Sequence, residues 1–230
     1  MDERPRIVAL IPGYQEGPRI AVVVAGARRS LPVVVVDDGS TDDTAAQAEK
    51  AGAIVLVQRP NAGKGAALRT GFRHALDHGA AAVVTLDADG QHDPSEIPAF
   101  LAAFEDSGAA LIIGRRDFAT MPAIRRLSNT LGGWIFSAAV GRRVADNQSG
   151  YRLIGRRLMT ALLDSDEPGF EFEVEMIARC IALDLPMDEI PIRTIYEGEP
   201  SHIRPWRHFT QFLRVSRDAR RIVKRGSRGR

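Results

Sequence analysis

Residues 85–94, TLDADGQHDP, place three aspartates, a glutamine and a histidine directly after an apolar run. Such a cluster is compatible with a calcium loop, a metal-dependent active site or an acidic turn. When the stretch is aligned with an EF-hand loop, His92 takes the place of the required glycine and Pro98 that of the bidentate glutamate. The calcium loop is therefore excluded.

The position at the end of a buried strand also argues against a bare acidic turn, and what remains is a D-x-D pair, Asp87 and Asp89. Two such carboxylates can share one divalent cation and leave part of its coordination shell to substrate phosphates. This arrangement suits reactions in which a diphosphate leaves, because the cation neutralises the developing charge. Gln91 lies beside the pair. Asp93, directly before Pro94, is predicted to cap the next helix instead.

The elements that position this cluster follow from the hydrophobic pattern. Short apolar runs rich in β-branched residues predict strands buried on both faces, at 7–11, 33–37, 53–57, 82–86 and 110–114. Helix-like segments lie between them, at 17–29, 41–51, 63–78 and 94–107. This alternation predicts a mostly parallel, three-layer α/β/α, Rossmann-like sheet. Beyond residue 115 we expect helices over 122–140 and 170–183 and strands after the DNQSGYR turn and over 187–196.

Three more polar loops follow predicted strands: PGYQEG, DDGSTDDT and QRPNAGKG. In open α/β sheets the ligand binds outside the carboxyl ends of the strands, so these loops should converge with TLDADGQHDP. Asp42 or Asp43 is placed to cap the following helix. Asp37 and Asp38 come too early for that, and a carboxylate there is suited to a ribose or a nucleobase.

NAGKG does not match the P-loop pattern, because position 58 is Gln and position 65 is Gly. Its glycines still permit close approach of the backbone to a ligand at a helix start, and Lys64 is placed to face a diphosphate. Simple turn chemistry is the alternative.

Together these motifs resemble glycosyltransferase family 2, whose members have the GT-A fold. IPGYQEG is similar to the family's opening P-x-Y-N-E, with Gln15 in place of the usual Asn, and the other three loops follow in the usual order. GRRD, DNQSGYR and PIRTIYEGEPSHIRP resemble the branch of dolichyl-phosphate mannose synthase and bacterial polyprenyl-phosphate glycosyltransferases.

The resemblance implies an inverting transfer of a hexose from a nucleotide-diphosphate sugar to a polyprenyl phosphate. The residues implied to bind the nucleotide part are Pro12, Tyr14, Glu16, Asp38, Lys64 and Asp87. Mg²⁺ or Mn²⁺ would bind at Asp87, Asp89 and Gln91. Asp146 is implied to lie near the reacting centre and, with Asp89, to be catalytic. Acceptor or other phosphates would meet Arg116, Arg125, Arg152 and Arg204, for which a solvated basic face is the alternative.

The acceptor decides whether a base is needed. A hydroxyl acceptor must lose a proton and requires a general base, whereas a lipid phosphate is already anionic and needs mainly positioning by cations. For a phosphate acceptor, Asp146 need not be a strong base. Glu171 and Glu173 are the other candidates for a base, and their spacing allows at most one of them to point inward.

Composition bounds the remaining choices. The single cysteine, Cys180, excludes a disulfide framework and fits a reducing compartment. Residues 207–230 carry nine Lys or Arg and one Asp, while the rest of the chain carries 22 Lys or Arg and 28 Asp or Glu. An acidic body argues against a general nucleic-acid binder. We therefore expect one GT-A domain, residues 1–206, and a basic tail, residues 207–230.

The tail is predicted to form an amphipathic helix that lies in a membrane interface. Its expected apolar face consists of Phe209, Phe212, Leu213, Ser216 and Val223. The alternatives are a solvated tail and a helix docked on the acidic body. With no apolar run long enough to span a membrane, the protein is expected in the cytoplasm, peripheral to the inner membrane face.

Two other functions remain open from the sequence. One is a family 2 enzyme with a soluble or saccharide hydroxyl acceptor, and the other is a nucleotide-sugar-binding protein without turnover. The sequence selects neither the donor's sugar and base nor an oligomeric state.

Overall fold

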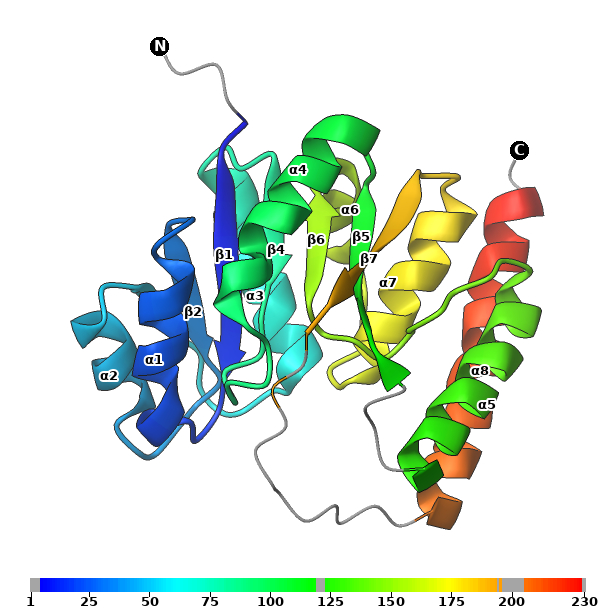
Figure 1. Ribbon diagram of the computed structural model, residues 1–230, viewed down its shortest axis with the longest axis horizontal. Helices are drawn as coiled ribbons and strands as arrows, with labels where there is room; N and C mark the ends of the chain where they lie inside the picture. The colour runs from blue at the N-terminus through cyan, green and yellow to red at the C-terminus, as the bar shows by residue number, and fades with distance from the viewer. Residues whose placement is uncertain (1–4, 119–122, 194, 196–204, 229–230) are drawn as a thin grey trace.

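A computed structural model shows one α/β sheet with helices on both faces (Figure 1). The structure describes residues 5–118, 123–193, 195 and 205–228, without the side chains of residues 123–125, 127–129, 205–213 and 227–228.

Seven strands in the described part of the chain form one sheet in the order β3-β2-β1-β4-β6-β5-β7. Strand β6 runs antiparallel to β4 and β5, and the other neighbouring pairs are parallel. The strands are β1 Ile7–Gly13, β2 Val33–Asp37, β3 Ile54–Val57, β4 Ala82–Thr85, β5 Leu111–Arg116, β6 Arg152–Gly155 and β7 Met187–Ile192. The predicted mostly parallel sheet is confirmed.

The central strand β1 shows why the apolar runs are continuous. Ile7, Ala9 and Ile11 enter the core on one face of the sheet, and Val8 and Leu10 enter the core on the other. Because successive side chains of a strand alternate between faces, a strand covered on both sides needs apolar residues at every position.

Strand β3 departs from the prediction of burial on both faces. Ile54 and Val57 are 52% and 51% exposed. The reason is its position, since β3 is the edge strand and pairs only with β2.

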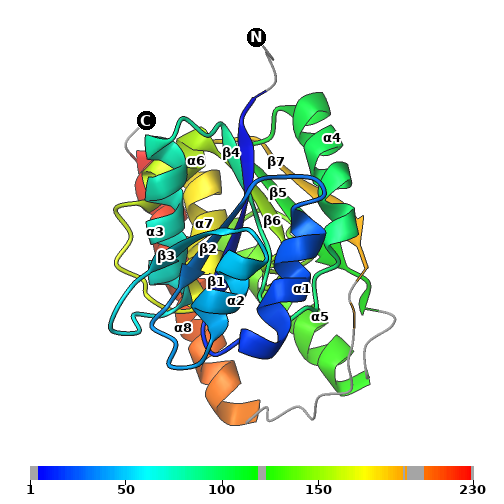
Figure 2. The same cartoon turned by 90° about the vertical axis from the view of Figure 1, so that its left-hand side faces the viewer.

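The helices divide between the two cores (Figure 2). One face of the sheet is covered by α1 Gly17–Ala27, α2 Thr44–Lys50 and α4 Ile97–Ser107, which follows the short 3₁₀ turn η1 Pro94–Glu96. The other face is covered by α3 Lys64–Asp77, α6 Arg156–Leu162 and α7 Glu171–Ala182.

The last two helices, α5 Ala123–Val140 and α8 Pro205–Arg228, lie side by side beyond α7, at the right of Figure 1. In the described part of α8, Ser216 and Ala219 are buried against the protein. A Cβ added to Gly226 would lie 2.7 Å from the Cβ of Ala182 on α7. The C-terminal half of α8 is therefore docked on the body.

The opposite side of α8 faces solvent and is strongly basic. Its exposed basic residues are Arg214, Arg217, Arg220, Arg221, Lys224 and Arg225. Within the described residues, no helix is both long and apolar enough to cross a bilayer.

Candidate functional site

The predicted convergence of polar loops occurs at the carboxyl ends of β1, β2, β3 and β4, at the lower edge of the sheet in Figure 1. The first two loops are joined directly. The Gln15 N–H donates to Ser40 Oγ at 3.0 Å, and the Glu16 N–H donates to Thr44 Oγ1 at 2.8 Å. These bonds hold the start of α1 against the start of α2.

Asp38 joins the second loop to the third. Its Oδ1 accepts from the Ala62 N–H and its Oδ2 from the Gly63 N–H, both at 2.8 Å, and Gln58 also donates to Oδ1. Asp38 is only 3% exposed. In this structure the side chain predicted to meet the nucleotide positions the NAGKG loop instead.

The NAGKG loop ends where α3 begins, at Lys64. Gly63 has φ +94°, a conformation that favours glycine. The Gly65 N–H donates to the Pro168 carbonyl at 2.8 Å, and a Cβ on Gly65 would lie 2.6 Å from the Glu167 carbonyl oxygen. The glycines thus let the segment before α7 pass over the start of α3.

Lys64 lies between two carboxylates from different elements. Its Nζ donates to Asp87 Oδ1, and Nζ is 2.8 Å from Glu173 Oε1 on α7. Burial by itself would lower the pKa of Lys64, but the two carboxylates outweigh it and the net shift is upward. Burial likewise opposes the ionisation of Asp87, yet the Lys64 ammonium draws its pKa down to about 2. Both groups are therefore charged at neutral pH.

The second carboxylate of the D-x-D pair has a different environment. Burial raises the pKa of Asp89, and the negative charge of Asp87 raises it further. Its Oδ1 accepts from the Gln91 N–H at 2.9 Å, while the Gln91 side chain is exposed. The Asp87 N–H donates to Nδ1 of the buried His92 at 3.0 Å, which fixes the end of the loop.

Asp93 has the capping role predicted for it, because its Oδ1 accepts from the Ser95 N–H at 2.9 Å. At α2 the cap is formed by Asp42, whose Oδ1 accepts from the Thr44 N–H at 3.0 Å. Asp43, at the N-cap position, makes no such bond.

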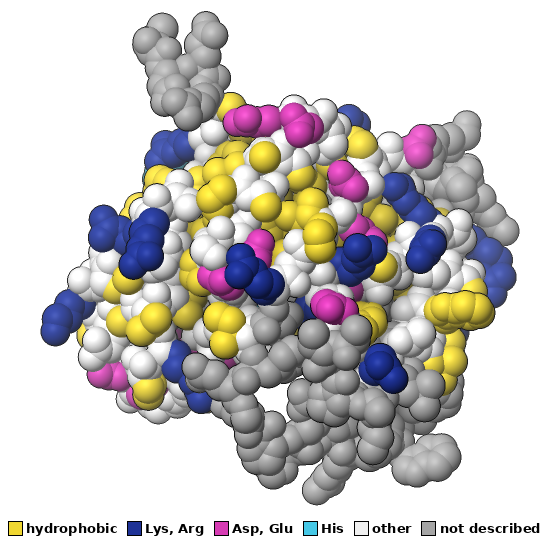
Figure 3. All heavy atoms as spheres, in the orientation of Figure 1, with side chains coloured by type: hydrophobic (Ala, Val, Ile, Leu, Met, Phe, Trp, Pro, Cys, Tyr) yellow, Lys and Arg dark blue, Asp and Glu magenta, His cyan; other side chains and the backbone are white. Residues whose placement is uncertain are grey.

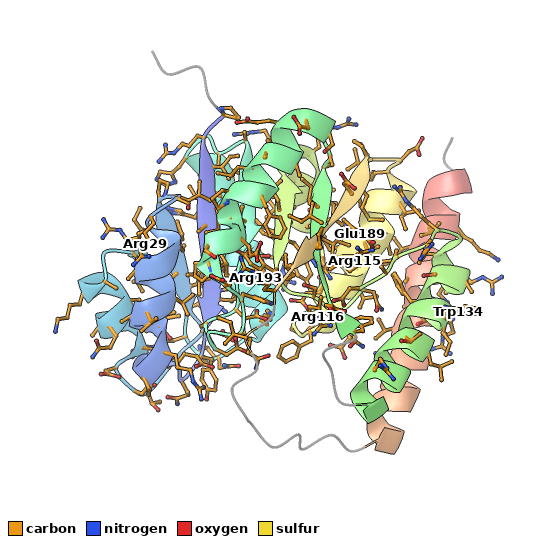
Figure 4. All side chains as sticks on the ribbon, in the orientation of Figure 1. Arg29, Arg115, Arg116, Trp134, Glu189 and Arg193 are labelled. Atoms are coloured by element: carbon orange, nitrogen blue, oxygen red, sulfur yellow. The ribbon has the colours of Figure 1, made fainter. Side chains whose placement is uncertain are left out.

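Asp146 is 1% exposed and forms a two-point ion pair with Arg116. Arg116 Nε donates to Oδ2 at 2.7 Å, and its Nη2 donates to Oδ1 at 2.9 Å. The Gln148 N–H donates to Oδ1 at 3.2 Å. The carboxylate predicted near the reacting centre thus orients an arginine at the end of β5 (Figure 4).

Arg152 does not have the phosphate-facing position that we expected. It is 1% exposed, and its guanidinium donates to the carbonyls of Ser149 at 2.7 Å, Asn147 at 3.1 Å and Glu173. A fully buried guanidinium needs several acceptors, and the turn before β6 supplies most of them. Arg152 therefore stabilises the DNQSGYR turn by binding its backbone carbonyls.

The other predicted residues are placed as follows. Pro12 is buried within β1, Tyr14 is 49% exposed, and Glu16 is half-buried at the N-cap of α1. The side chain of Arg125 and the whole of Arg204 lie outside the described residues.

Two further residues, Glu173 and Gly150, belong to this site beyond what their sequence motifs indicate. Glu173, considered only as a substitute base, is 7% exposed and holds Lys64. A Cβ on Gly150 would lie 2.8 Å from Asp87 Oδ2 and 3.0 Å from both Glu173 Oε1 and Lys64 Nζ. The glycine of DNQSGYR was the available signal, since it marks a close approach of the backbone to other groups.

Among the described residues, no three His, Cys, Asp or Glu side chains are grouped so as to hold a metal ion. The donor chemistry at Asp87 and Asp89 nevertheless fits a hard cation, since both are carboxylates and Asp87 already attracts one ammonium. The Lys64 ammonium stands in for part of that positive charge.

Comparison with known proteins gives the class. The family model described as glycosyl transferase family 2 matches residues 8–157, and the chain belongs to this family. It is 32% identical to an undecaprenyl-phosphate mannosyltransferase of Micrococcus luteus, over 84% of this chain and 85% of the relative. It is 28% identical to a UDP-N-acetylglucosamine–dolichyl-phosphate N-acetylglucosaminyltransferase of Methanococcus voltae, over 83% of this chain and 86% of the relative.

The fold is shared with solved structures. Glucosyl-3-phosphoglycerate synthase from Mycobacterium tuberculosis, crystallised with Mn²⁺, UDP and glucosyl-3-phosphoglycerate, superposes with a TM-score of 0.66 at 21% identity, covering 91% of this chain and 76% of that chain. The predicted GT-A fold and the similarity to the polyprenyl-phosphate branch of family 2 are confirmed.

Proposed function

We propose that this protein transfers a hexose, with inversion at the anomeric carbon, from a nucleotide-diphosphate sugar to a polyprenyl phosphate. The observation that carries the choice of acceptor is the ion pair between Asp146 and Arg116. A hydroxyl acceptor requires a base with a free lone pair. Oδ2 of Asp146 accepts from Arg116 Nε and from the Arg116 N–H, and Oδ1 accepts from Arg116 Nη2 and from the Gln148 N–H, so both lone pairs of each oxygen are engaged. A guanidinium held in this way suits an anionic phosphate.

The donor side follows from the D-x-D loop. Asp87 and Asp89 would hold Mg²⁺ or Mn²⁺ with the donor's diphosphate, beside Gln91. When bound, this ion would neutralise the charge that develops on the departing diphosphate. Support comes from the structural relative that was crystallised with Mn²⁺ and UDP. Lys64 lies beside Asp87 and would contribute a second positive charge.

The nucleoside would occupy the edge of the sheet next to β1 and β2. Tyr14 is half-exposed there, between Pro12 in β1 and Glu16 at the N-cap of α1. Asp38 would act chiefly by fixing the loop before Lys64.

In the transfer itself, a phosphate oxygen of the acceptor attacks the anomeric carbon as the bond from that carbon to the diphosphate breaks. The products are a glycosyl polyprenyl phosphate and a nucleoside diphosphate. The acceptor phosphate brings its own negative charge, so no protein group has to remove a proton. The chain's task is positioning, by Arg116 and, as a prediction outside the described residues, by Arg125 and Arg204.

The two curated relatives named above share a polyprenyl or dolichyl phosphate acceptor but differ in the sugar. We therefore assign the acceptor class and not the donor. A lipid acceptor also implies peripheral contact with the cytoplasmic face of the membrane. The basic side of α8 supports this, because each Lys or Arg near an anionic leaflet adds about 1 kcal/mol.

The test is transfer of labelled sugar into an organic phase. Vesicles containing a polyprenyl phosphate are incubated with Mn²⁺, the protein and, in turn, labelled UDP-glucose, GDP-mannose or UDP-N-acetylglucosamine. We expect one donor to place label in the lipid extract. Asp89→Asn should reduce this at least a hundredfold, of the order seen when a single transition-state charge contact is lost. Asp93→Asn, in the same loop but at the helix cap, is the matched control and should stay active.

The alternatives have their own outcomes. Label found only in a water-soluble glycoside would establish the hydroxyl-acceptor enzyme. Nucleotide binding without transfer to any acceptor would establish the binding protein without turnover.

A further inference from the structure

Lys64 is the only side chain of the NAGKG motif long enough to cross from α3 to other elements, and it is held at two points. One is Asp87, in the D-x-D loop, and the other is Glu173 Oε1 at 2.8 Å, in the first turn of α7. The Lys64 side chain is 15% exposed and that of Glu173 9% exposed. The ammonium is thus shared between Asp87, which would also bind the donor's cation, and Glu173, which lies outside the D-x-D loop.

The position of Glu173 follows from several independent contacts. Its backbone carbonyl accepts from the buried Arg152, its N–H donates to the Phe170 carbonyl at 3.2 Å, and Gly150 packs directly over its carboxylate. The ring of Phe170 lies 5.4 Å from Lys64 Nζ. Glu173 is therefore a rigid anchor, whereas Asp87 lies in a loop.

A role as general base does not fit these contacts. The Oε1 of Glu173 already binds an ammonium, and the backbone at Gly150 covers the carboxylate. A base must reach the proton that it removes.

We propose that Glu173 is a positioning residue that keeps the Lys64 ammonium available to the donor's diphosphate. Without Glu173, the Lys64 charge would be neutralised entirely by Asp87, and the ammonium would move toward that carboxylate. With Glu173, Lys64 would keep its place if Asp87 bound a cation, and its ammonium would remain beside the diphosphate. The inference rests on the proposed function, since it takes the ligand to be a nucleoside diphosphate.

The sign of one measurement separates this role from a plain charge effect. Removing a negative charge from a site should tighten the binding of an anion. Loss of a lysine's positioning should weaken it. We therefore expect Glu173→Gln, which preserves size, to weaken the binding of a nucleoside diphosphate.

The experiment is calorimetric titration in EDTA, without a metal ion, with whichever of UDP and GDP the wild-type chain binds more tightly. Lys64→Met should weaken binding about tenfold, the effect of losing one charged hydrogen bond. Glu173→Gln should weaken it severalfold. In the double variant, Glu173→Gln should add nothing, because its effect passes through Lys64.

Glu175→Gln is the matched control. It lies on the same helix and pairs with Arg179 at 2.6 Å, on another side of α7. It should leave the affinity unchanged. Glu173→Asp keeps the charge on a shorter side chain and should restore part of the affinity. The melting temperature of each variant shows that it is folded.

The failures can be told apart. If Lys64→Met leaves the affinity unchanged, Lys64 does not bind the donor and the proposed donor site is wrong. If Lys64→Met weakens binding but Glu173→Gln tightens it or has no effect, only the positioning role is wrong. Effects of the two substitutions that multiply in the double variant also overturn it.

Discussion

Carboxylates that look alike in the sequence have different partners in the structure. Asp38 accepts from backbone N–H groups, Asp87 from an ammonium and Asp146 from a guanidinium. Asp93 caps a helix. At the scale of residues, the partner decides the role, and the partners of Asp38, Asp87 and Asp146 come from elements distant in sequence.

Gly150→Ala tests how closely the site is packed. The added Cβ would lie 2.8 to 3.0 Å from side-chain atoms of Asp87, Glu173 and Lys64, and would force these three groups apart. We expect a folded protein whose transfer rate falls about a hundredfold, the cost of a displacement near 1 Å. Gly155→Ala is the control, because its Cβ would meet Ala110 at an ordinary 3.5 Å. Equal activity of the two variants would contradict the assigned geometry.

Cys180 should be chemically inert in the folded chain. Burial raises the pKa of its thiol to about 11, and Cys180 is a fully buried residue of α7. In the folded protein the reactive thiolate is therefore scarce near pH 8.5, whereas the cysteine thiol of an unfolded chain is about half ionised at that pH. Labelling with a maleimide at pH 8 should be slow in buffer and fast in denaturant. Fast labelling of the native protein would show that α7 opens.

Helix starts organise the site at the scale of elements. Helix α3 begins at Lys64, directly after Gly63 with its positive φ. The first turn of α7 contains Glu173, which pairs with that lysine. The described side chains of α8 take no part in this cluster, and the helix packs on the outer side of α7. Its described half is amphipathic, and its apolar side packs on the protein, which is one of the alternatives that the sequence left open.

Ala219→Asp tests the docking of α8. Ala219 is 2% exposed, so a carboxylate there would be removed from water. We expect a loss of about 2–4 kcal/mol in the free energy of unfolding, measured by urea denaturation. Arg220→Asp, the neighbouring exposed position, should change stability by less than about 0.5 kcal/mol. A neutral Ala219→Asp would mean that the helix is undocked in solution.

Charge and apolar exposure coincide at one end of the whole molecule. Residues 214–225 of α8 carry six basic residues and one acidic residue. On the neighbouring α5, Trp134 is 76% exposed and Leu131 is 52% exposed. Figure 3 shows an apolar patch beside basic side chains at this right-hand edge, where Figure 4 labels Trp134. Together they make a surface suited to an anionic bilayer.

Vesicle co-sedimentation tests this surface. Binding to vesicles with anionic lipid should exceed binding to neutral vesicles and weaken with salt. Replacing Arg217, Arg221 and Arg225 by Gln should lower the partition coefficient about a hundredfold, at about 1 kcal/mol per charge. Trp134→Ser should lower it further. Transfer to a short, water-soluble polyprenyl phosphate should be unchanged in these variants.

The controls for vesicle binding are Val22 on α1 and Arg29 just after it, at the other end of the molecule. Val22 is 75% exposed, similar to the 76% of Trp134, and Arg29 is labelled at the left of Figure 4. Val22→Ser and Arg29→Gln should leave vesicle binding unchanged. If they weaken it as much as the α5 and α8 variants do, the protein has no preferred membrane face.

The sequence by itself determined the sheet, the family and the D-x-D loop. These features depend on local pattern: continuous apolar runs, polar residues at strand ends and glycines at helix starts. The edge position of β3 could not be predicted from the sequence. Strand order depends on which strands become neighbours in the fold, and the apolar run of an edge strand has a composition similar to that of a buried one.

The tertiary structure alone decided which charges meet. Lys64 and Glu173 are 109 positions apart in the sequence, and Arg116 and Asp146 are 30 apart. Whether an arginine faces a phosphate or a backbone carbonyl, as at Arg152, depends on burial, which motif spacing does not record. The same holds for α8: its composition predicts two faces, and only packing against α7 shows which one the protein covers.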